Sequence, residues 1–232
     1  TPPSPRWRRP AVGGGLAVVG DVRKEEDVQR AVDAAVERFG GIDVVVNNAS
    51  AISTERTEDL SAKKFDLMMD INVRGTFLLT KAALPHLQKS GNAQVLTISP
   101  PLNMNPPHWL GAHPSYTLSK YGMTLLSLGW ANEYGAAQDG TGIGFSCLWP
   151  PQTYIATSAV TNLSAGDELV QRSRSADIMA DAAVAILSRL AAEVNGECFI
   201  DADVLTASGV TDLSRYGGGD DPPMWDIFLD KS

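Results

Sequence analysis

The chain has 232 residues, a formal net charge of -8, 44% hydrophobic residues and 20% charged residues. It is too apolar for a disordered protein, and its length suits one domain with a single core. The excess of 27 Asp and Glu over 19 Lys and Arg argues against a nucleic-acid or anionic-membrane partner, because both require clustered positive charge.

Several further classes are excluded by what the sequence lacks. The two cysteines, Cys147 and Cys198, lie in apolar stretches, which indicates buried thiols in a reducing compartment. The three histidines show no paired spacing with cysteine, so we expect no metal site. No run approaches the ~20 apolar residues of a membrane span, and the start of the chain has no secretory h-region. We therefore expect a cytoplasmic protein.

The first third of the chain predicts an arm and the beginning of an alternating pattern. Residues 1–15 are rich in Pro and Gly and predict an irregular arm. Residues 16–19 predict a short strand. The helix that follows keeps helical apolar spacing up to Phe39 and ends at two glycines. Residues 42–46 are almost continuously apolar and β-branched, as in a strand covered on both faces.

The same alternation continues to the end of the chain. Helices are predicted over residues 63–87, 115–134 and, from a Ser175 cap, about 175–190. Strands are predicted over residues 94–98, 142–148 and 197–200. Irregular connections are expected over 99–114 and 149–175, and residues 217–232 form a tail that is ordered only if it docks on the body.

Strands that alternate with amphipathic helices predict an α/β fold. We expect one doubly wound parallel sheet over residues 16–216, with right-handed crossovers. In such sheets ligands bind beyond the carboxyl ends of the strands. The informative residues are therefore those that follow the strands: Asp21, residues 47–50, Ser99 and residues 149–150.

Tyr116 and Lys120 are the first candidates for chemistry. Four residues apart on a predicted helix, they share one face. A phenol, with a reference pKa of ~10, is a poor acid–base catalyst at neutral pH, and a neighbouring ammonium favours its phenolate. Taken alone, however, the pair is more simply an ordinary Tyr beside a surface Lys, because Y-x-x-x-K occurs by chance in many chains.

The surroundings of this pair change that interpretation. The segment Asn47-Asn48-Ala49-Ser50 follows a buried strand and leaves room for a ligand to approach. Asn72 lies inside an apolar helical segment, where Asn is disfavoured. Either its side chain makes a specific hydrogen bond that the function needs, or its polar groups simply find hydrogen-bond partners at a kink of the helix. The ordered set NNAS, NVRG, TIS, YTLSK and LWP is improbable as coincidence.

This ordered set resembles the signatures of the short-chain dehydrogenase/reductase family. The longer segments NNASAIS, DLMMDINVRGT, ISPPLN, YTLSKYGM and LWP resemble its hydroxysteroid dehydrogenase-like branch, and the resemblance runs from about Gly14 to the end. It implies a Rossmann-like domain that uses NAD(P) to interconvert a hydroxyl and a carbonyl on a small or lipid-like substrate. The branch favours NADP over NAD.

The resemblance also implies a role for each matching residue. Tyr116 would be the general acid and base, and Lys120 would support it and bind the nicotinamide ribose. Asn72 would hold a water of the proton relay. The family's substrate-orienting Ser falls at Pro100 here, so Ser99 replaces it only if the loop shifts. The cofactor-binding residues would be Asp21, Val22, Asn48, Ala49, Tyr116, Lys120, Pro150 and Thr153.

One family feature is missing from the printed sequence. The turn T-G-x-x-x-G-I-G, which places the cofactor pyrophosphate on a helix amino terminus, does not occur. Residues 13–15 are glycines, but a predicted strand follows them rather than a helix. We therefore expect a truncated member that lacks the first βαβ portion, on the order of 30 residues or more, and binds the cofactor poorly.

Two other functions stay open at this point. The chain could be a non-catalytic Rossmann-like interaction module, or a sugar-nucleotide epimerase, although the epimerase's extra substrate domain has no room here. Residues 149–175 form an apolar lid or, alternatively, serve ordinary packing or an oligomer contact. The apolar side chains concerned are Trp149, Tyr154, Ile155, Val160 and Leu163. The family also implies a homo-oligomer paired through helices 63–87 and 115–134. The apolar residues Leu125, Leu128 and Trp130 fit that interface and fit a core equally well.

Overall fold

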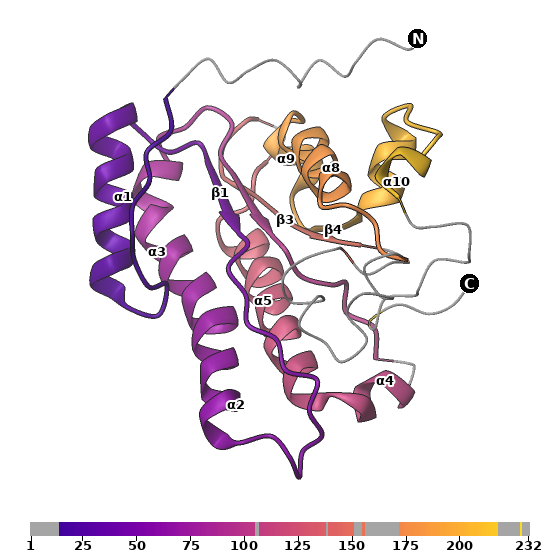
Figure 1. Ribbon diagram of the computed structural model, residues 1–232. Coiled ribbons are helices and arrows are strands. Elements are labelled where there is room, and N and C mark those ends of the chain that lie inside the picture. Colours follow the sequence, from indigo (N-terminus) through magenta and orange to yellow (C-terminus); the bar gives the residue numbers. More distant parts are fainter. Residues whose placement is uncertain are drawn as a thin grey trace.

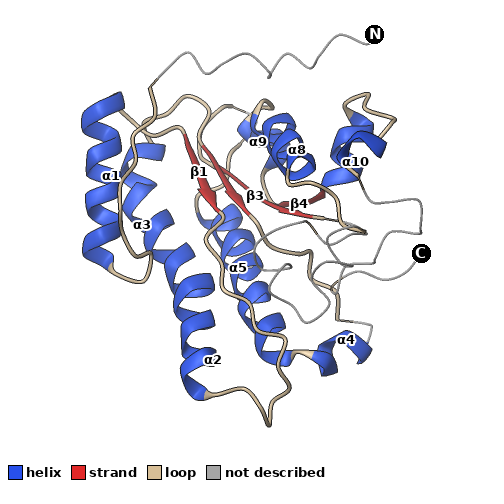
Figure 2. Cartoon of the chain, viewed as in Figure 1, coloured by secondary structure: helices blue, strands red, loops and turns tan. Residues whose placement is uncertain are grey.

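The computed structural model describes residues 14–104, 107–137, 139–150, 155, 172–217 and 228. Helices cover both faces of a parallel sheet (Figures 1 and 2). The first half contains α1 (Glu25–Phe39), β1 (Val44–Asn47), α2 (Ala62–Met68), the π-helix η2 (Met69–Arg74), α3 (Gly75–Leu87) and β2 (Gln94–Thr97). The second half contains α4 (Pro107–Ala112), α5 (Pro114–Glu133), β3 (Gly144–Trp149), α8 (Asp177–Leu187), α9 (Ala191–Val194), β4 (Glu197–Ile200), α10 (Asp201–Ala207) and the 3-10 helix η3 (Ser214–Tyr216).

The sheet confirms the predicted α/β class. Its strands are parallel and lie in the order β1-β2-β3-β4. Val45, Val95 and Phe145 are in register on neighbouring strands and pack against α3 and α5. Leu96 and Leu148 face the other way and pack against α8. Strands β2 and β3 are buried at every position, which explains why both carry apolar residues on both faces.

Two predicted elements differ from the structure. Residues 16–19 form no strand, and Leu16 and Val19 are exposed. An apolar run becomes a strand only where another strand supplies hydrogen-bond partners, and within the described residues none lies beside this run. The helix predicted over residues 63–87 is interrupted by η2, where the Gly75 amide donates to the Asp70 carbonyl five residues earlier.

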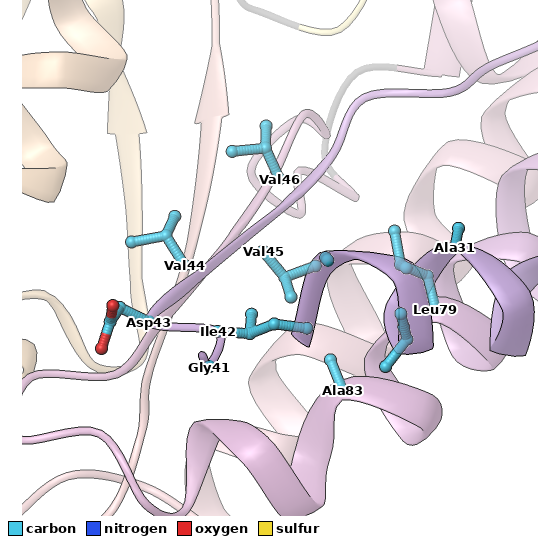
Figure 3. Close-up of a pocket in the computed structure, with 11 residues that line it drawn as sticks. Ala31, Gly41, Ile42, Asp43, Val44, Val45, Val46, Leu79 and Ala83 are labelled. Carbon is cyan, nitrogen blue, oxygen red and sulfur yellow. The ribbon is translucent and has the colours of Figure 1, made fainter. Parts of the chain in front are cut away.

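The open edge of β1 is bordered by an apolar cavity of about 530 Å³ (Figure 3). Ala31 and Val32 of α1 line one side, and Leu79 and Ala83 of α3 another. Val44 and Val46 of β1 are 40% and 42% exposed, although valine side chains favour burial. Among the described residues, β1 therefore has a pairing partner on one side only.

Some predictions fall wholly or partly outside the described residues. These are the arm 1–15 apart from Gly14 and Gly15, and the tail 217–232 apart from Gly217 and Phe228. Within the 149–175 connection, Thr153, Tyr154, Val160 and Leu163 also lie outside. Ile155 is described and packs with the core beneath α8, which favours ordinary packing for that position.

Candidate active site

Lys120 is held where three strand ends meet. Its ammonium Nζ donates to the Ile98 carbonyl after β2 (2.7 Å) and to Ser50 Oγ after β1 (3.5 Å). It also lies 5.1 Å from the ring centroid of Trp149, the last residue of β3, within the range of a cation–π interaction. Only 2% of Lys120 is exposed. This lysine is therefore positioned at the carboxyl edge of the sheet, where α/β proteins bind ligands.

Tyr116 lies one turn before Lys120 on α5. It is 6% exposed, and its ring centroid lies 5.7 Å from that of Phe228 and 6.1 Å from that of His113. Met68 and Trp149 complete the apolar cluster around it. The helix therefore carries a phenol and an ammonium to the same end of the sheet, with apolar walls beside the phenol.

Asn72 fastens the loop after β1 to α5. It is fully buried in η2, and its Oδ1 accepts from the Ala51 amide at 2.7 Å. Its Nδ2 donates to the Ala51 carbonyl (2.9 Å) and to Ser119 Oγ (2.9 Å). Ser119 in turn donates to the Tyr116 carbonyl at 2.8 Å. The side chain thus links the loop that carries Ser50 to the helix that carries Tyr116 and Lys120.

Ser99 lies beneath α5. It is fully buried, and its Oγ accepts from Thr124 Oγ1 at 2.9 Å. Thr124 lies eight positions after Tyr116 on α5, which is about 12 Å along a helix axis. The Thr124 hydroxyl also lies 2.7 Å from the Pro100 carbonyl oxygen. Ser99 therefore holds the strand end against the helix and is bonded well away from the Tyr116 turn.

Asp21 and Val22 are held against the start of α3. Val22 packs on Gly75, where a Cβ atom would come within 3.0 Å of the Val22 side chain. Arg23 forms an ion pair with Asp21 and donates to both of its carboxylate oxygens. Its hydrogen bonds lower the pKa of Asp21 to about 2. Arg74 donates to the Arg23 carbonyl and holds the same turn.

The remaining predicted cofactor residues line the same edge. Asn48 and Ala49 follow β1 and are exposed, and Pro150 follows β3 and is buried. The Asn48 amide donates to the Val46 carbonyl at 3.1 Å, which turns the chain sharply after the strand. Thr153 lies outside the described residues.

Three aromatic residues around the site, Phe228, Tyr121 and His113, were not among the residues that the sequence predicted for the site. Phe228 is fully buried and lies 5.3 Å from Trp149 and 5.9 Å from Tyr121, centroid to centroid. Tyr121 donates to the Asn103 carbonyl at 2.8 Å and so holds the loop after β2. His113 contacts Thr117 at 3.0 Å, and burial lowers the pKa of its imidazole below the ordinary value of 6.5.

Two further findings concern metal ions and membranes. Within the described ranges, no group of three or more His, Cys, Asp or Glu side chains converges as a metal site would require. None of the helices in that same part of the chain has the length and apolar content needed to cross a bilayer.

Comparison with known proteins identifies close relatives. The family model described as short chain dehydrogenase matches residues 13–167. A crystal structure from Xanthomonas campestris is 45% identical with a TM-score of 0.86, covering 94% of this chain and 77% of that one. A short chain dehydrogenase from Mycobacterium thermoresistibile is 43% identical with a TM-score of 0.80, covering 91% and 73%.

The curated relatives are longer than this chain. Hydroxysteroid dehydrogenase-like protein 2 from Xenopus laevis is 44% identical over 223 residues, which is 96% of this chain and 51% of that protein. The Homo sapiens protein of the same name is 42% identical, covering 95% and 51%. The chain therefore spans about half the length of these relatives.

Proposed function

The chain belongs to the short-chain dehydrogenase family, and from that premise we propose that it is an NAD(P)-dependent oxidoreductase. The reaction interconverts a hydroxyl and a carbonyl on a small or lipid-like substrate. The observation that carries the proposal is the placement of Lys120 at three converging strand ends, one helical turn after Tyr116.

The protein's own part in this reaction is to move a proton. The Tyr116 hydroxyl donates a proton to the carbonyl oxygen during reduction and accepts it from the hydroxyl during oxidation. The nearby ammonium of Lys120 stabilises the phenolate that this donation leaves. Asn72 keeps the loop of residues 48–51 against α5, so that substrate and cofactor meet the phenol in one orientation.

The residues present fit one end of a nicotinamide dinucleotide. Lys120 offers an ammonium beside the exposed loop of Asn48 and Ala49, which suits the ribose hydroxyls next to the nicotinamide. The group, when bound, supplies or accepts the hydride. The diphosphate end has no such support among the described residues. The first turn of α1 carries Glu25, Glu26 and Asp27, and these carboxylates repel phosphate at the end of a helix that otherwise favours anions.

The preferences for one cofactor and for one kind of substrate have less support than the reaction itself. A gluconate 5-dehydrogenase from Burkholderia cenocepacia was solved with NADP, and a 3-ketoacyl-(acyl-carrier-protein) reductase from Brucella melitensis with NADH. Both are under 25% identical to this chain and share its fold, so the preference for NADP rests on the hydroxysteroid dehydrogenase-like branch alone. The aromatic walls formed by Trp149, Tyr121 and Phe228 favour an apolar substrate.

Titration of the 232-residue chain with NADPH tests the fit. NADPH emission should rise with an affinity weaker than micromolar, because the described residues hold only the nicotinamide riboside end. Lys120→Gln should weaken binding further, whereas Lys64→Gln, which removes an exposed ion pair with Glu55, should not. Equal binding by the two variants would contradict the placement of the nicotinamide end at Lys120, and micromolar affinity would show that other residues hold the diphosphate.

The non-catalytic alternative is favoured by one observation. The exposed valines and the apolar cavity beside β1 leave a sheet edge open within the described residues. Such an edge is a template for pairing with another strand. If NADPH does not bind at millimolar concentration, while circular dichroism shows a folded chain, this alternative replaces the oxidoreductase.

A further inference from the structure

The two cysteines of the chain are direct neighbours in the sheet. Cys147 on β3 and Cys198 on β4 are register partners, so their side chains leave the sheet on the same face. They extend a row that begins with Asn47 and Thr97 and crosses all four strands. Both cysteines are present as free thiols, and they are the only two in the sequence.

We infer that Cys147 and Cys198 form a redox modification site, a dithiol that hydrogen peroxide converts reversibly into an intramolecular disulfide. Adjacent strands lie about 4.8 Å apart, which is inside the range of about 4.4–6.8 Å that the Cα atoms of a disulfide span. Within the described residues β4 pairs with β3 alone, so it is free to make the small shift that brings the two sulfurs into bonding distance.

The two thiols differ in ways that suit a stepwise oxidation. Cys147 is fully buried, whereas Cys198 is half-buried on the edge strand, where a small oxidant reaches it. The neighbouring Cys198 thiol lowers the pKa of Cys147 to about 7. Hydroxyls of Ser99, Ser127 and Thr124 lower it as well, while burial opposes them. The same pairing and burial raise the pKa of Cys198.

The difference in pKa assigns the roles in the reaction. Peroxide that reaches Cys198 meets the neighbouring Cys147 sulfur, which has the lower pKa and attacks one peroxide oxygen as the thiolate after its proton has passed to solvent. The O–O bond breaks, hydroxide leaves and is protonated by solvent to water, and Cys147 becomes a sulfenic acid. The Cys198 sulfur then displaces hydroxide from the Cys147 sulfur, its proton completes the second water, and an S–S bond forms. The two sulfurs lose two electrons in total, and the peroxide gains them.

The oxidation takes place in the sheet next to the candidate active site. Cys147 is the register partner of Thr97 on β2, which lies two residues before Ser99. The inference itself does not depend on the proposed function, because its readout is the state of the two sulfurs.

The test treats the folded 232-residue chain with hydrogen peroxide and counts thiols after denaturation. We expect two titratable thiols to fall to none, a mass loss of two hydrogens in the monomer, and recovery of both thiols with dithiothreitol. Thiols that persist, mass gains of oxygen alone, or disulfide-linked dimers would each overturn the inference.

A matched control keeps the cysteine count and moves one thiol to the other face of the sheet. The double variant Ser146→Cys with Cys147→Ser places that thiol beside Glu197 rather than beside Cys198. It should lose no pair of hydrogens under the same treatment, and its fold is checked by circular dichroism. Equal disulfide formation in the control would show that proximity in the folded sheet is not the cause, and would contradict the site.

Discussion

Replacing Asn72 by Ala should destabilise the chain far more than a surface Asn replacement. The change removes three hydrogen bonds, two with Ala51 and one with Ser119, all between 2.7 and 2.9 Å. A buried hydrogen bond contributes about 1 kcal/mol net. Ala51 is half-buried, so water replaces part of what it loses. We therefore expect a loss of about 2–3 kcal/mol in the free energy of unfolding, or about 5–10 °C in Tm.

Urea unfolding followed by circular dichroism measures this loss, with Asn92→Ala as the control. Asn92 also bridges two backbone groups, accepting from the Ala191 amide (2.7 Å) and donating to the Arg189 carbonyl (3.1 Å), but it is exposed. Its replacement should cost about 1 kcal/mol or less. If the two variants are equally stable, Asn72 does not fasten the loop to α5, and the positioning role assigned to it is wrong.

Three further predictions follow from contacts of α5 and its neighbours. A Cβ atom at Gly122 would lie 2.8 Å from the Val73 side chain, so Gly122→Ala should lower the free energy of unfolding by about 1–3 kcal/mol. A Cβ atom at Gly129 would meet nothing within 4 Å, so Gly129→Ala should raise the free energy of unfolding by about 0.5–1 kcal/mol. Thermal unfolding of both variants checks the difference in sign. Burial lowers the pKa of His113 in the folded chain, so the unfolded chain takes up a proton more readily once the pH drops below 6.5. The free energy of unfolding should therefore fall below that pH, and His113→Phe should flatten this profile in urea titrations. Leu125 on α5 is 58% exposed, and we propose that this face of the helix pairs two copies of the chain. Leu125→Glu should then reduce the mass measured by light scattering to that of a monomer. An unchanged mass would refute the interface.

The fold was predictable where the signal is local. The strands at residues 94–97 and 197–200 were located to within one residue, because a short β-branched or apolar run between turns has few alternatives. The placement of Tyr116 and Lys120 one turn apart on α5 followed from a spacing of four on a helix. Asn72 indicated a departure from a regular helix, although its type, a π-helix, did not follow from the residue.

The rest depends on contacts between distant parts of the chain. Residues 16–19 have the composition of a strand, but a strand needs a neighbour, and composition does not report one. Phe228 lies beside Tyr116 although more than a hundred positions separate them in the chain, and no local pattern predicts that contact. Trp130 was compatible with an interface or a core; the structure packs it against Phe145 in the core.

Tyr116 is the residue that we propose moves the proton at the carboxyl edge of the sheet. The direct measurement is the NADPH-dependent reduction of decanal, with NADPH up to millimolar concentration, by the wild-type chain and two variants. Tyr116→Phe should lower kcat by about 10²–10⁴-fold. Tyr121→Phe, a buried Tyr on the same helix whose hydroxyl contacts Asn103, should retain most of kcat. Equal turnover by the two variants would contradict this role of Tyr116.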